Sequence, residues 1–320
     1  MAFRPSRSRL RRALLTALVV ASVAMPVSGA VRPAGVPAPA PTIPDALPAA
    51  TPTALAERYA ATRADIAAAA RMADAHGDGK RAGALRVMAD PARHLLSFDG
   101  RHGGRTVEVV GSLSRADRIA VLVPGAGMSI DNYWRLKGGA QALWRELGDR
   151  AAVVVWLGYE TPAAVSLAVA TSRRADGAAP ELGKFLDELR RVKPTARTSL
   201  LCHSYGSVVC ARAAAGLRVA DIVLYGSPGV GAEDVAGLHS SAAVWAGRGG
   251  DDWIADVPHV SLQLPDTDVG FGEDPVSEGF GARVFDAGPG GHSDYLKPGS
   301  VSLKNLARIV DGRIPDAPRA

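Results

Sequence analysis

A series of short apolar runs, separated by segments with a helical pattern, constrains the fold of this 320-residue chain more than any other feature. The runs cover residues 119–123, 152–156, 199–202, 222–225, 242–246 and 283–286. They are apolar on both faces, which is typical of parallel strands that are buried on both sides. Because strand–helix–strand crossovers are right-handed, the pattern predicts an α/β fold with a doubly wound, mostly parallel sheet.

The segments before these runs predict a smaller, separate layer. Residues 53–76 and 81–89 have helical patterns, and we expect residues 53–93 to form a helical N-terminal extension of a domain that spans 53–320. Residues 95–98 and 106–110 are expected to form antiparallel strands. Further helices are expected at 132–147, 162–173, 180–192 and 300–311.

The first 30 residues are predicted to be an export signal. Five arginines precede residue 13, residues 13–24 are apolar, and Ser28-Gly29-Ala30 supplies small residues for cleavage near Ala30. We therefore expect a secreted or cell-envelope protein, with an uncleaved membrane anchor as the alternative. Residues 31–52 are rich in proline and alanine and are expected to be a linker.

The charge balance excludes nucleic acid as an expected partner. The net charge is +5, from 37 basic and 32 acidic residues, and the five arginines of the signal account for all of the excess. The histidines and aspartates lack the spacing of a zinc site, and Gly125-Ala126-Gly127 lacks the rest of a dinucleotide fingerprint. We expect no metal and no cofactor.

The pentapeptide Cys202-His203-Ser204-Tyr205-Gly206 offers a reaction class. It joins an apolar run to a helical segment of small residues, which predicts a strand, a sharp turn with Ser204 at its apex, and a helix. Such a turn exposes the serine hydroxyl above the sheet, and small residues are needed two positions before and after it. Gly206 and Cys202 fill these positions, although glycine is more usual at the first. The alternative is a serine in an ordinary tight turn.

A serine nucleophile needs a base and an acid, and both are expected after strands. His292 lies in a glycine-rich loop after the last run and is the predicted base. Asp252, after the run at 242–246, is the predicted acid that orients it, with Asp251 as the rival. His203 is interpreted as structural, and the order Ser, Asp, His along the chain matches one known triad order.

The oxyanion of the reaction is expected to face two backbone N–H groups. One is the amide of Tyr205, directly after the nucleophile. The other is the amide of Ala126, in the turn Val123-Pro124-Gly125-Ala126-Gly127 after an early strand. The alternative for this segment is a plain glycine turn.

Cys202 and Cys210 are the only cysteines of the chain. The first is expected to end a strand and the second to lie well along the next helix. We expect this separation to be too large for a bridge, and therefore two small buried thiols rather than a disulfide.

Together, Val123-Pro124-Gly125, His203-Ser204-Tyr205-Gly206-Ser207 and Gly291-His292-Ser293-Asp294-Tyr295 resemble the α/β-hydrolase superfamily, and within it a high-GC bacterial family of exported serine hydrolases of uncertain substrate. The resemblance covers about residues 105–311. It implies hydrolysis of an ester or related acyl bond through an acyl-enzyme.

The expected function is cleavage of a carboxylic ester, with a small-molecule or lipid-like acyl ester as substrate. The connection at 227–241 is too short for a large lid, and the insertion at 253–282 contains Trp253, Phe271 and Phe280 as candidate walls of the site. Amide or peptide cleavage and acyl transfer use the same triad and are alternatives. A third possibility is a catalytically silent protein that binds in the cell envelope.

Overall fold

The computed structural model describes residues 36–42, 46–163, 171–257, 261–264 and 267–318. The predicted signal peptide, with its cleavage near Ala30, lies outside the described residues, as does part of the predicted linker.

An eight-stranded sheet forms the centre of the molecule, in the order β1-β2-β4-β3-β5-β6-β7-β10. The β1–β2 and β2–β4 pairs are antiparallel and the other pairs are parallel, as the sequence predicts. A second sheet pairs β8 with β9. The strands are β1 (His94–Asp99), β2 (Arg105–Gly111), β3 (Arg118–Val123), β4 (Ala151–Leu157), β5 (Arg197–His203), β6 (Asp221–Tyr225), β7 (Ala243–Gly247), β8 (Ser261–Leu264), β9 (Thr267–Gly270) and β10 (Arg283–Val284).

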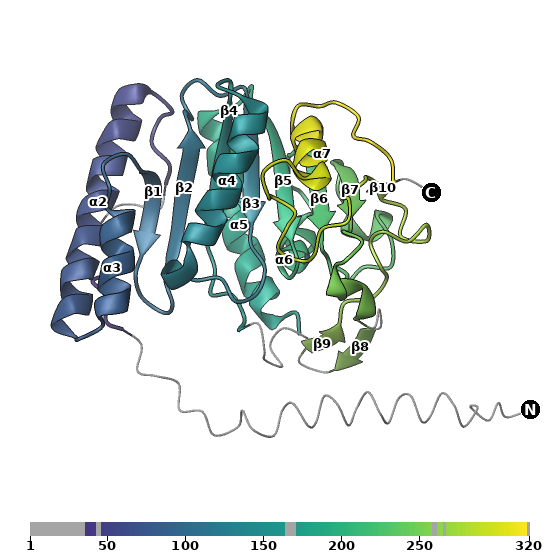
Figure 1. Cartoon of the computed structure of the whole chain (residues 1–320), viewed down its shortest axis with the longest axis horizontal. Coiled ribbons are helices and arrows are strands. Elements are labelled where there is room, and N and C mark those ends of the chain that lie inside the picture. The colour runs from purple at the N-terminus through teal and green to yellow at the C-terminus, as the bar shows by residue number, and fades with distance from the viewer. Residues whose placement is uncertain (1–35, 43–45, 164–170, 258–260, 265–266, 319–320) are drawn as a thin grey trace, which may run out of the picture.

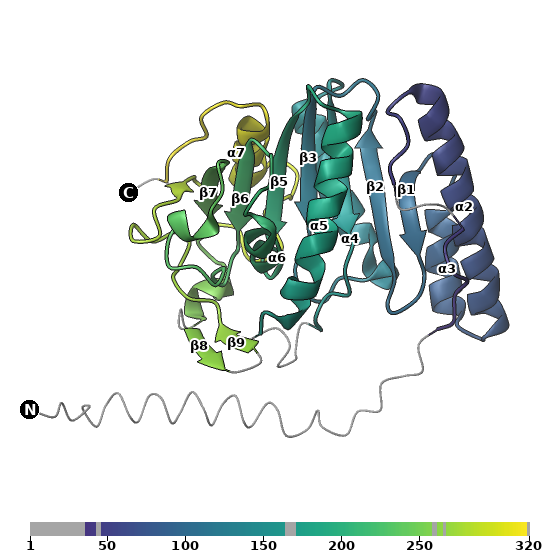
Figure 2. The ribbon, with the colours of Figure 1, turned by 180° about the vertical axis from the view of Figure 1, so that it is seen from behind.

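Helices cover both faces of the main sheet. In Figure 1, α4 and α7 lie in front of the strands, and Figure 2 shows α5 and α6 on the opposite face. The helices α2 and α3 lie beside the edge strand β1. The α-helices are α2 (Pro52–Ala75), α3 (Gly79–Met88), α4 (Trp134–Leu147), α5 (Arg173–Val192), α6 (Gly206–Ala213) and α7 (Val301–Val310), and the 3-10 helices are η1 (Ile130–Asn132), η3 (Ala236–Leu238) and η4 (Trp253–Asp256).

Neighbouring residues of the central strands serve two separate cores. Val121 and Leu200 pack in the cluster on the side of α5 and α6, whereas Leu122 and Leu201 pack in the cluster on the side of α4 and α7. All four are at most 4% exposed. Because successive side chains of a strand point to opposite faces, a strand covered on both sides must be continuously apolar. This is the pattern from which the fold was predicted.

The N-terminal extension packs its apolar side chains against β1. Thr51 caps α2 by accepting a hydrogen bond from the Ala54 amide, and Pro52 occupies the first turn, where its missing N–H is not needed. A separate core cluster joins α2 and α3 to the sheet and includes Ile66, Leu85 and Phe98. The extension thereby covers an edge strand whose backbone groups would otherwise face solvent.

One expectation for the connecting segments needs correction. The helix expected at 180–192 is longer than predicted, because α5 covers Arg173–Val192 with Pro180 inside it. Pro180 is exposed, so the backbone acceptor that loses its helical partner there can bond to water. The helix expected at 162–173 falls largely on residues 164–170, which lie outside the described part of the chain. The insertion at 253–282 contains η4 and the β8–β9 hairpin.

The expectation of two free thiols is wrong. Cys202 and Cys210 form a disulfide, and both residues are fully buried. Helix α6 begins just after the turn at Ser204 and folds back over β5, so that its second turn lies above the end of the strand. The two Cα atoms are consequently 6.4 Å apart, within the range that a disulfide spans. The bridge joins the strand to the helix directly behind the turn.

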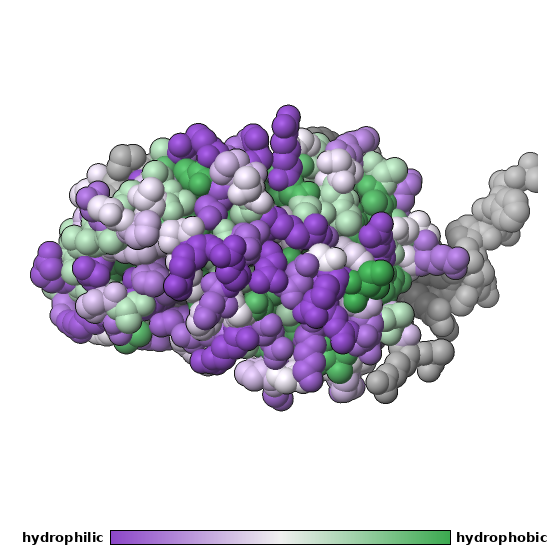
Figure 3. All heavy atoms as spheres, turned by 90° about the horizontal axis from the view of Figure 1, so that it is seen from above, coloured by the Kyte–Doolittle hydropathy of each residue, from purple (hydrophilic) through white to green (hydrophobic). Residues whose placement is uncertain are grey.

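Seen from above, the surface of the molecule is largely hydrophilic, with apolar residues in small scattered groups (Figure 3). Among the residues that the structure describes, no helix combines the length and apolar character needed to cross a bilayer. Within the same residues, no group of three or more histidine, cysteine, aspartate or glutamate side chains is arranged to hold a metal ion.

We expect the disulfide to stabilise the protein by about 2–3 kcal/mol, because it closes a short loop in the unfolded chain. Replacing both cysteines by alanine should lower the free energy of unfolding in urea by this amount. Alkylation of denatured, unreduced wild-type protein should modify neither Cys202 nor Cys210. Modification of both without a reductant would contradict the bridge.

Candidate active site

Ser204 occupies the turn between β5 and α6 in a left-handed backbone conformation, with φ of 52°. Non-glycine residues adopt this conformation rarely, and they do so mostly where surrounding contacts enforce it. Here the Ser204 amide donates to the Tyr225 carbonyl of β6 (3.0 Å), and the Ser207 amide donates to the Ser204 carbonyl (2.9 Å). The turn therefore presents the Ser204 hydroxyl at the carboxyl edge of the sheet, as the sequence predicts.

The small residues around Ser204 are required by close backbone approaches. A Cβ on Gly206 would lie 2.5 Å from the Val123 carbonyl oxygen, and one on Gly125 would lie 2.6 Å from the Ser204 Cβ. The crowding at Gly206 thus comes from the end of β3. On the other side of the turn, Cys202 is small enough for the site and uses its side chain to bond α6.

The structure brings Ser204, His292 and Asp252 together from three separate segments. The His292 Nε2 atom is 2.9 Å from the Ser204 Oγ, and His292 Nδ1 is 2.8 Å from the Asp252 Oδ1. A carboxylate only accepts hydrogen bonds, so Nδ1 carries the proton and Nε2 is free to accept one from the serine. Asp252 is 3% exposed and lies just after β7, whereas Ser204 and His292 are half-buried.

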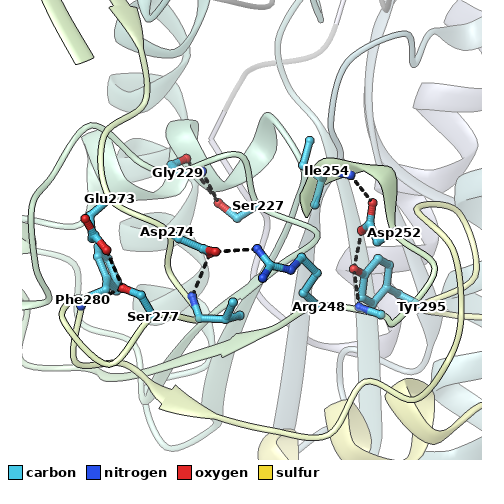
Figure 4. Close-up of polar contacts among 12 residues, drawn as sticks. Ser227, Gly229, Arg248, Asp252, Ile254, Glu273, Asp274, Ser277, Phe280 and Tyr295 are labelled. Carbon is cyan, nitrogen blue, oxygen red and sulfur yellow. Dashed lines mark hydrogen bonds and ion pairs between the residues drawn. The ribbon is translucent and has the colours of Figure 1, made fainter. Parts of the chain in front are cut away.

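Asp252 is surrounded by donors that stabilise its charged form. Burial alone raises the pKa of a carboxyl, but hydrogen bonds from His292, Tyr295 and the Ile254 amide hold the pKa of Asp252 below its ordinary value. Tyr295 donates its hydroxyl to the Asp252 Oδ2 (2.5 Å), and the same hydroxyl accepts from the Gly249 amide (3.0 Å). Figure 4 shows Asp252 between the Ile254 amide and the Tyr295 hydroxyl.

His203 supports the backbone of His292. Its Nε2 lies 2.8 Å from the His292 carbonyl oxygen, so this nitrogen is the donor, and the two ring centroids are 4.8 Å apart. Burial, with the nearby His292, lowers the pKa of His203 from its usual value to about 4. His203 is therefore neutral near pH 7 and places no second positive charge beside His292.

Gly226 leaves room for the Asp252 and His292 side chains. It follows β6 with φ of 57°, and a Cβ there would lie 3.0 Å from the Asp252 Oδ2 and 3.3 Å from the His292 Nδ1. Any larger residue would be strained in its backbone and would press on the hydrogen bond between the two side chains.

The predicted oxyanion donors lie on two anchored segments. The Tyr205 hydroxyl donates to the Thr171 carbonyl (2.7 Å) ahead of α5, and the Tyr159 hydroxyl donates to the Pro124 carbonyl (2.6 Å) at the start of the other segment. Within the described ranges, the amides of Tyr205 and Ala126 donate to no protein acceptor. Both N–H groups are thus available to a ligand.

A buried pair of serines holds the Ser204 backbone from behind. The Ser207 hydroxyl donates to the Ser204 carbonyl and is 2.6 Å from the Ser227 hydroxyl. Ser227 in turn accepts a hydrogen bond from the Gly229 amide (Figure 4). This network connects the turn to the loop after β6.

Other aspartates and histidines of the chain, and two of the three aromatic residues expected to wall the site, lie elsewhere or outside the described residues. Asp251 is exposed, unlike its neighbour Asp252, and His239 lies in the exposed connection before β7. His259 lies outside the described residues. Phe271 and Phe280 are buried in the core cluster beside α5 and α6 and do not form an open wall. Of the three aromatic residues expected to wall the site, only Trp253 is exposed.

The sequence interpretation gave no role to Tyr295 and Gly226, and it placed His203 among structural residues without a partner. Tyr295 is three residues beyond His292 on the same glycine-rich loop, and Gly226 directly follows a predicted strand. Both therefore met the criterion of lying at the carboxyl edge, but nothing in the sequence indicated their contacts with Asp252.

Comparisons with known proteins identify relatives over part of the chain. Uncharacterized proteins of Mycobacterium bovis and Mycobacterium tuberculosis are 29% identical over 177 residues, which is 48% of this chain and 66% of theirs. The chain thus spans slightly less than two thirds of the length of the curated relatives that it matches.

Solved structures are similar at lower identity. An α/β serine hydrolase without lid from Xanthomonas campestris is 20% identical, with 71% of this chain and 97% of that chain covered and a TM-score of 0.44. The crystal structure of esterase PE8 is 17% identical, with 64% of this chain and 97% of that chain covered and a TM-score of 0.44.

A family model described as alpha/beta hydrolase matches residues 99–262, just over half of the chain. The match runs from the end of β1 into β8 and includes Ser204 and Asp252. It agrees with the observed sheet, in which parallel strands alternate with helices on both faces. The chain belongs to the alpha/beta hydrolase family.

Proposed function

We propose that this protein is an exported serine hydrolase that cleaves a carboxylic ester through an acyl-enzyme on Ser204. The continuous hydrogen-bonded chain from the Ser204 Oγ through His292 to Asp252 is the observation that carries the proposal. In this proposal His292 is the general base and Asp252 holds its tautomer and stabilises the imidazolium.

In the first half of the reaction, His292 Nε2 takes the proton of the Ser204 hydroxyl while Oγ attacks the acyl carbon. The carbonyl oxygen becomes negative and is stabilised by the amides of Tyr205 and Ala126, which lack protein acceptors in the described part of the chain. The bond between the acyl carbon and the alcohol oxygen then breaks. The alcohol leaves with the proton from His292.

In the second half, His292 takes a proton from a water molecule, whose oxygen attacks the acyl carbon of the serine ester. The bond to Oγ breaks, Ser204 recovers its proton from His292, and the carboxylic acid leaves. The neutral state of His203 favours both halves, because a charged neighbour would oppose the imidazolium.

An open site supports a substrate of small or medium size. Ser204 and His292 are each half-buried, and the connection between β6 and β7 contains only η3 and turns. No helical lid is present in that connection, all of which the structure describes. Short acyl esters are therefore the first substrates to test.

The disulfide supports the export part of the proposal. Structural disulfides form and persist in oxidising compartments and are rare in the bacterial cytosol. The Cys202–Cys210 bridge is fully buried, which suits a permanent structural bond. It agrees with the signal peptide expected from the sequence.

Replacing Ser204 with alanine should abolish both ester turnover and covalent labelling by a fluorophosphonate, because the attacking oxygen is removed. Wild-type protein should be labelled on the peptide that contains Ser204, as mapped by mass spectrometry, and should hydrolyse p-nitrophenyl acetate or butyrate. Cleavage of matched anilides in preference to the esters would favour an amidase. Absence of labelling in folded wild-type protein would contradict a serine nucleophile.

Asp252→Asn should lower kcat for p-nitrophenyl acetate by on the order of 10³- to 10⁴-fold, because the amide no longer stabilises the imidazolium and favours the wrong tautomer. Asp251→Asn is the matched control, since Asp251 is the adjacent carboxylate and is exposed. It should retain wild-type kcat. Equal losses in both variants would remove the distinction between the two aspartates.

His203 should make stability depend on pH. Its pKa is about 4 in the folded protein and about 6.5 when unfolded, so the unfolded chain binds a proton in this window that the folded protein does not. Stability should fall as pH drops from 6.5 to 4, by up to about 3 kcal/mol from this group. Urea unfolding of His203→Gln across the same range should show a shallower dependence. An unchanged slope would contradict the assignment.

A further inference from the structure

Trp253 is a large aromatic residue that remains exposed beside the candidate base. Trp253 is 57% exposed. The centroid of its ring lies 4.7 Å from the centroid of the His292 ring, with 49° between the two ring planes. The other buried or half-buried aromatic residues near His292 pack among themselves. Exposure of an indole at this place leaves one aromatic surface uncovered by the protein.

The backbone around Trp253 is fixed. Trp253 is the first residue of η4, and Asp252 caps this short helix by accepting from the Ile254 amide (2.9 Å). Ile254 is 3% exposed and anchors the helix in the protein. The same carboxylate that accepts from His292 therefore also sets the position of the residue that carries the indole.

Trp253 is the exposed member of the two rings that contact His292. The other ring in contact with His292 is His203, which is packed against Tyr225 and Tyr295 with centroid distances of 5.1 and 5.7 Å. That group is buried or nearly so, and no substrate can enter between its members. Trp253 is therefore the ring beside His292 that solvent or a ligand can reach.

The departing alcohol must occupy space beside His292. The imidazole returns its proton to the alcohol oxygen, so this oxygen lies within hydrogen-bond distance of Nε2 when the acyl-enzyme forms. The group attached to that oxygen extends away from the acyl carbon, whereas the acyl group stays attached to Ser204. An exposed ring next to His292 is thus placed to contact the alcohol part of an ester.

We propose that Trp253 binds the alcohol group of the substrate and selects esters whose alcohol carries a ring with a face that can stack on an indole. An aromatic ring, or the C–H face of a sugar ring, is the chemistry that stacks on an exposed indole. This inference rests on the proposed ester hydrolysis and names the alcohol group as the part that the enzyme recognises. Trp253 is a specificity-determining residue, distinct from the residues that transfer protons.

Esters of one acid with different alcohols test the proposal. Benzyl acetate and ethyl acetate share the acyl group, and only the first carries a ring. In Trp253→Ala, the ratio of kcat/KM for benzyl over ethyl acetate should fall by about threefold to tenfold, the usual value of one aromatic contact. Trp253→Phe should recover part of the ratio. The same ratio is then measured with methyl α-glucoside acetylated at one hydroxyl in place of benzyl acetate. Whichever ratio falls more in Trp253→Ala shows whether the indole prefers a sugar or an aryl alcohol.

Trp134 supplies the matched control, because it is also an exposed tryptophan, at 69%, at the start of α4. Trp134→Ala should leave the benzyl-to-ethyl ratio at the wild-type value. A second series, ethyl acetate to ethyl hexanoate, should respond equally in wild type and Trp253→Ala, since the acyl chain lies on the other side of the scissile bond.

The alternatives give different results. Equal losses for benzyl and ethyl acetate would mean that Trp253 only holds His292 in place, and a change confined to the acyl series would mean that it binds the acyl chain. Either result overturns the proposal. Wild-type protein that is labelled by a fluorophosphonate but shows an unchanged ratio in Trp253→Ala overturns the role of Trp253 alone. Failure of wild type in both labelling and turnover overturns the proposed function together with this inference.

Discussion

The left-handed backbone of Ser204 is the constraint on which the rest of the site depends. A residue with a Cβ is held in this conformation only if the flanking strand and helix fix both of its peptide planes. Hydrogen bonds to β6 and within the first turn of α6 do so, and the Cys202–Cys210 bridge ties the two elements together. The absence of side chains at Gly125 and Gly206 lets the end of β3 approach the turn. The position of one oxygen atom thus results from the packing of three central strands.

Asp252 and His292 are held by a second set of contacts, which converge on one loop. His292 and Tyr295 both reach Asp252, one through each carboxylate oxygen, while His203 holds the His292 carbonyl from below. A buried carboxylate is stable only when its lone pairs are satisfied, and three donors satisfy those of Asp252. The arrangement explains how a charge can be kept almost out of contact with water beside His292, which would change its own charge in the proposed reaction.

Much of this arrangement could be predicted from the sequence, because parallel strands that are buried on both faces are apolar throughout and end at a common edge. That rule predicts that Ser204, Asp252 and His292 lie close together. The contacts of Tyr295 and Gly226 could not be predicted in this way, because they depend on the three-dimensional path of each loop. The disulfide could not be predicted for a related reason: Cys202 ends a strand and Cys210 lies along the next helix, but α6 folds back onto β5 and brings the two residues together. Long-range side-chain contacts and the direction in which a helix leaves its strand depend on the tertiary structure. Local composition carries little information about either.

The contacts around Ser204 differ widely in how far apart along the chain their partners lie. The disulfide links residues 8 positions apart, whereas the bond between His292 and Asp252 spans 40 positions and that between His292 and Ser204 spans 88. Closing a short loop costs less conformational entropy than closing a long one, so the turn around Ser204 is able to form while the last quarter of the chain is still unfolded. A nascent or truncated chain in that condition has a shaped turn and a bridge but no imidazole beside the hydroxyl. In the proposed mechanism, catalysis therefore requires the C-terminal loop to be folded onto the edge of the sheet.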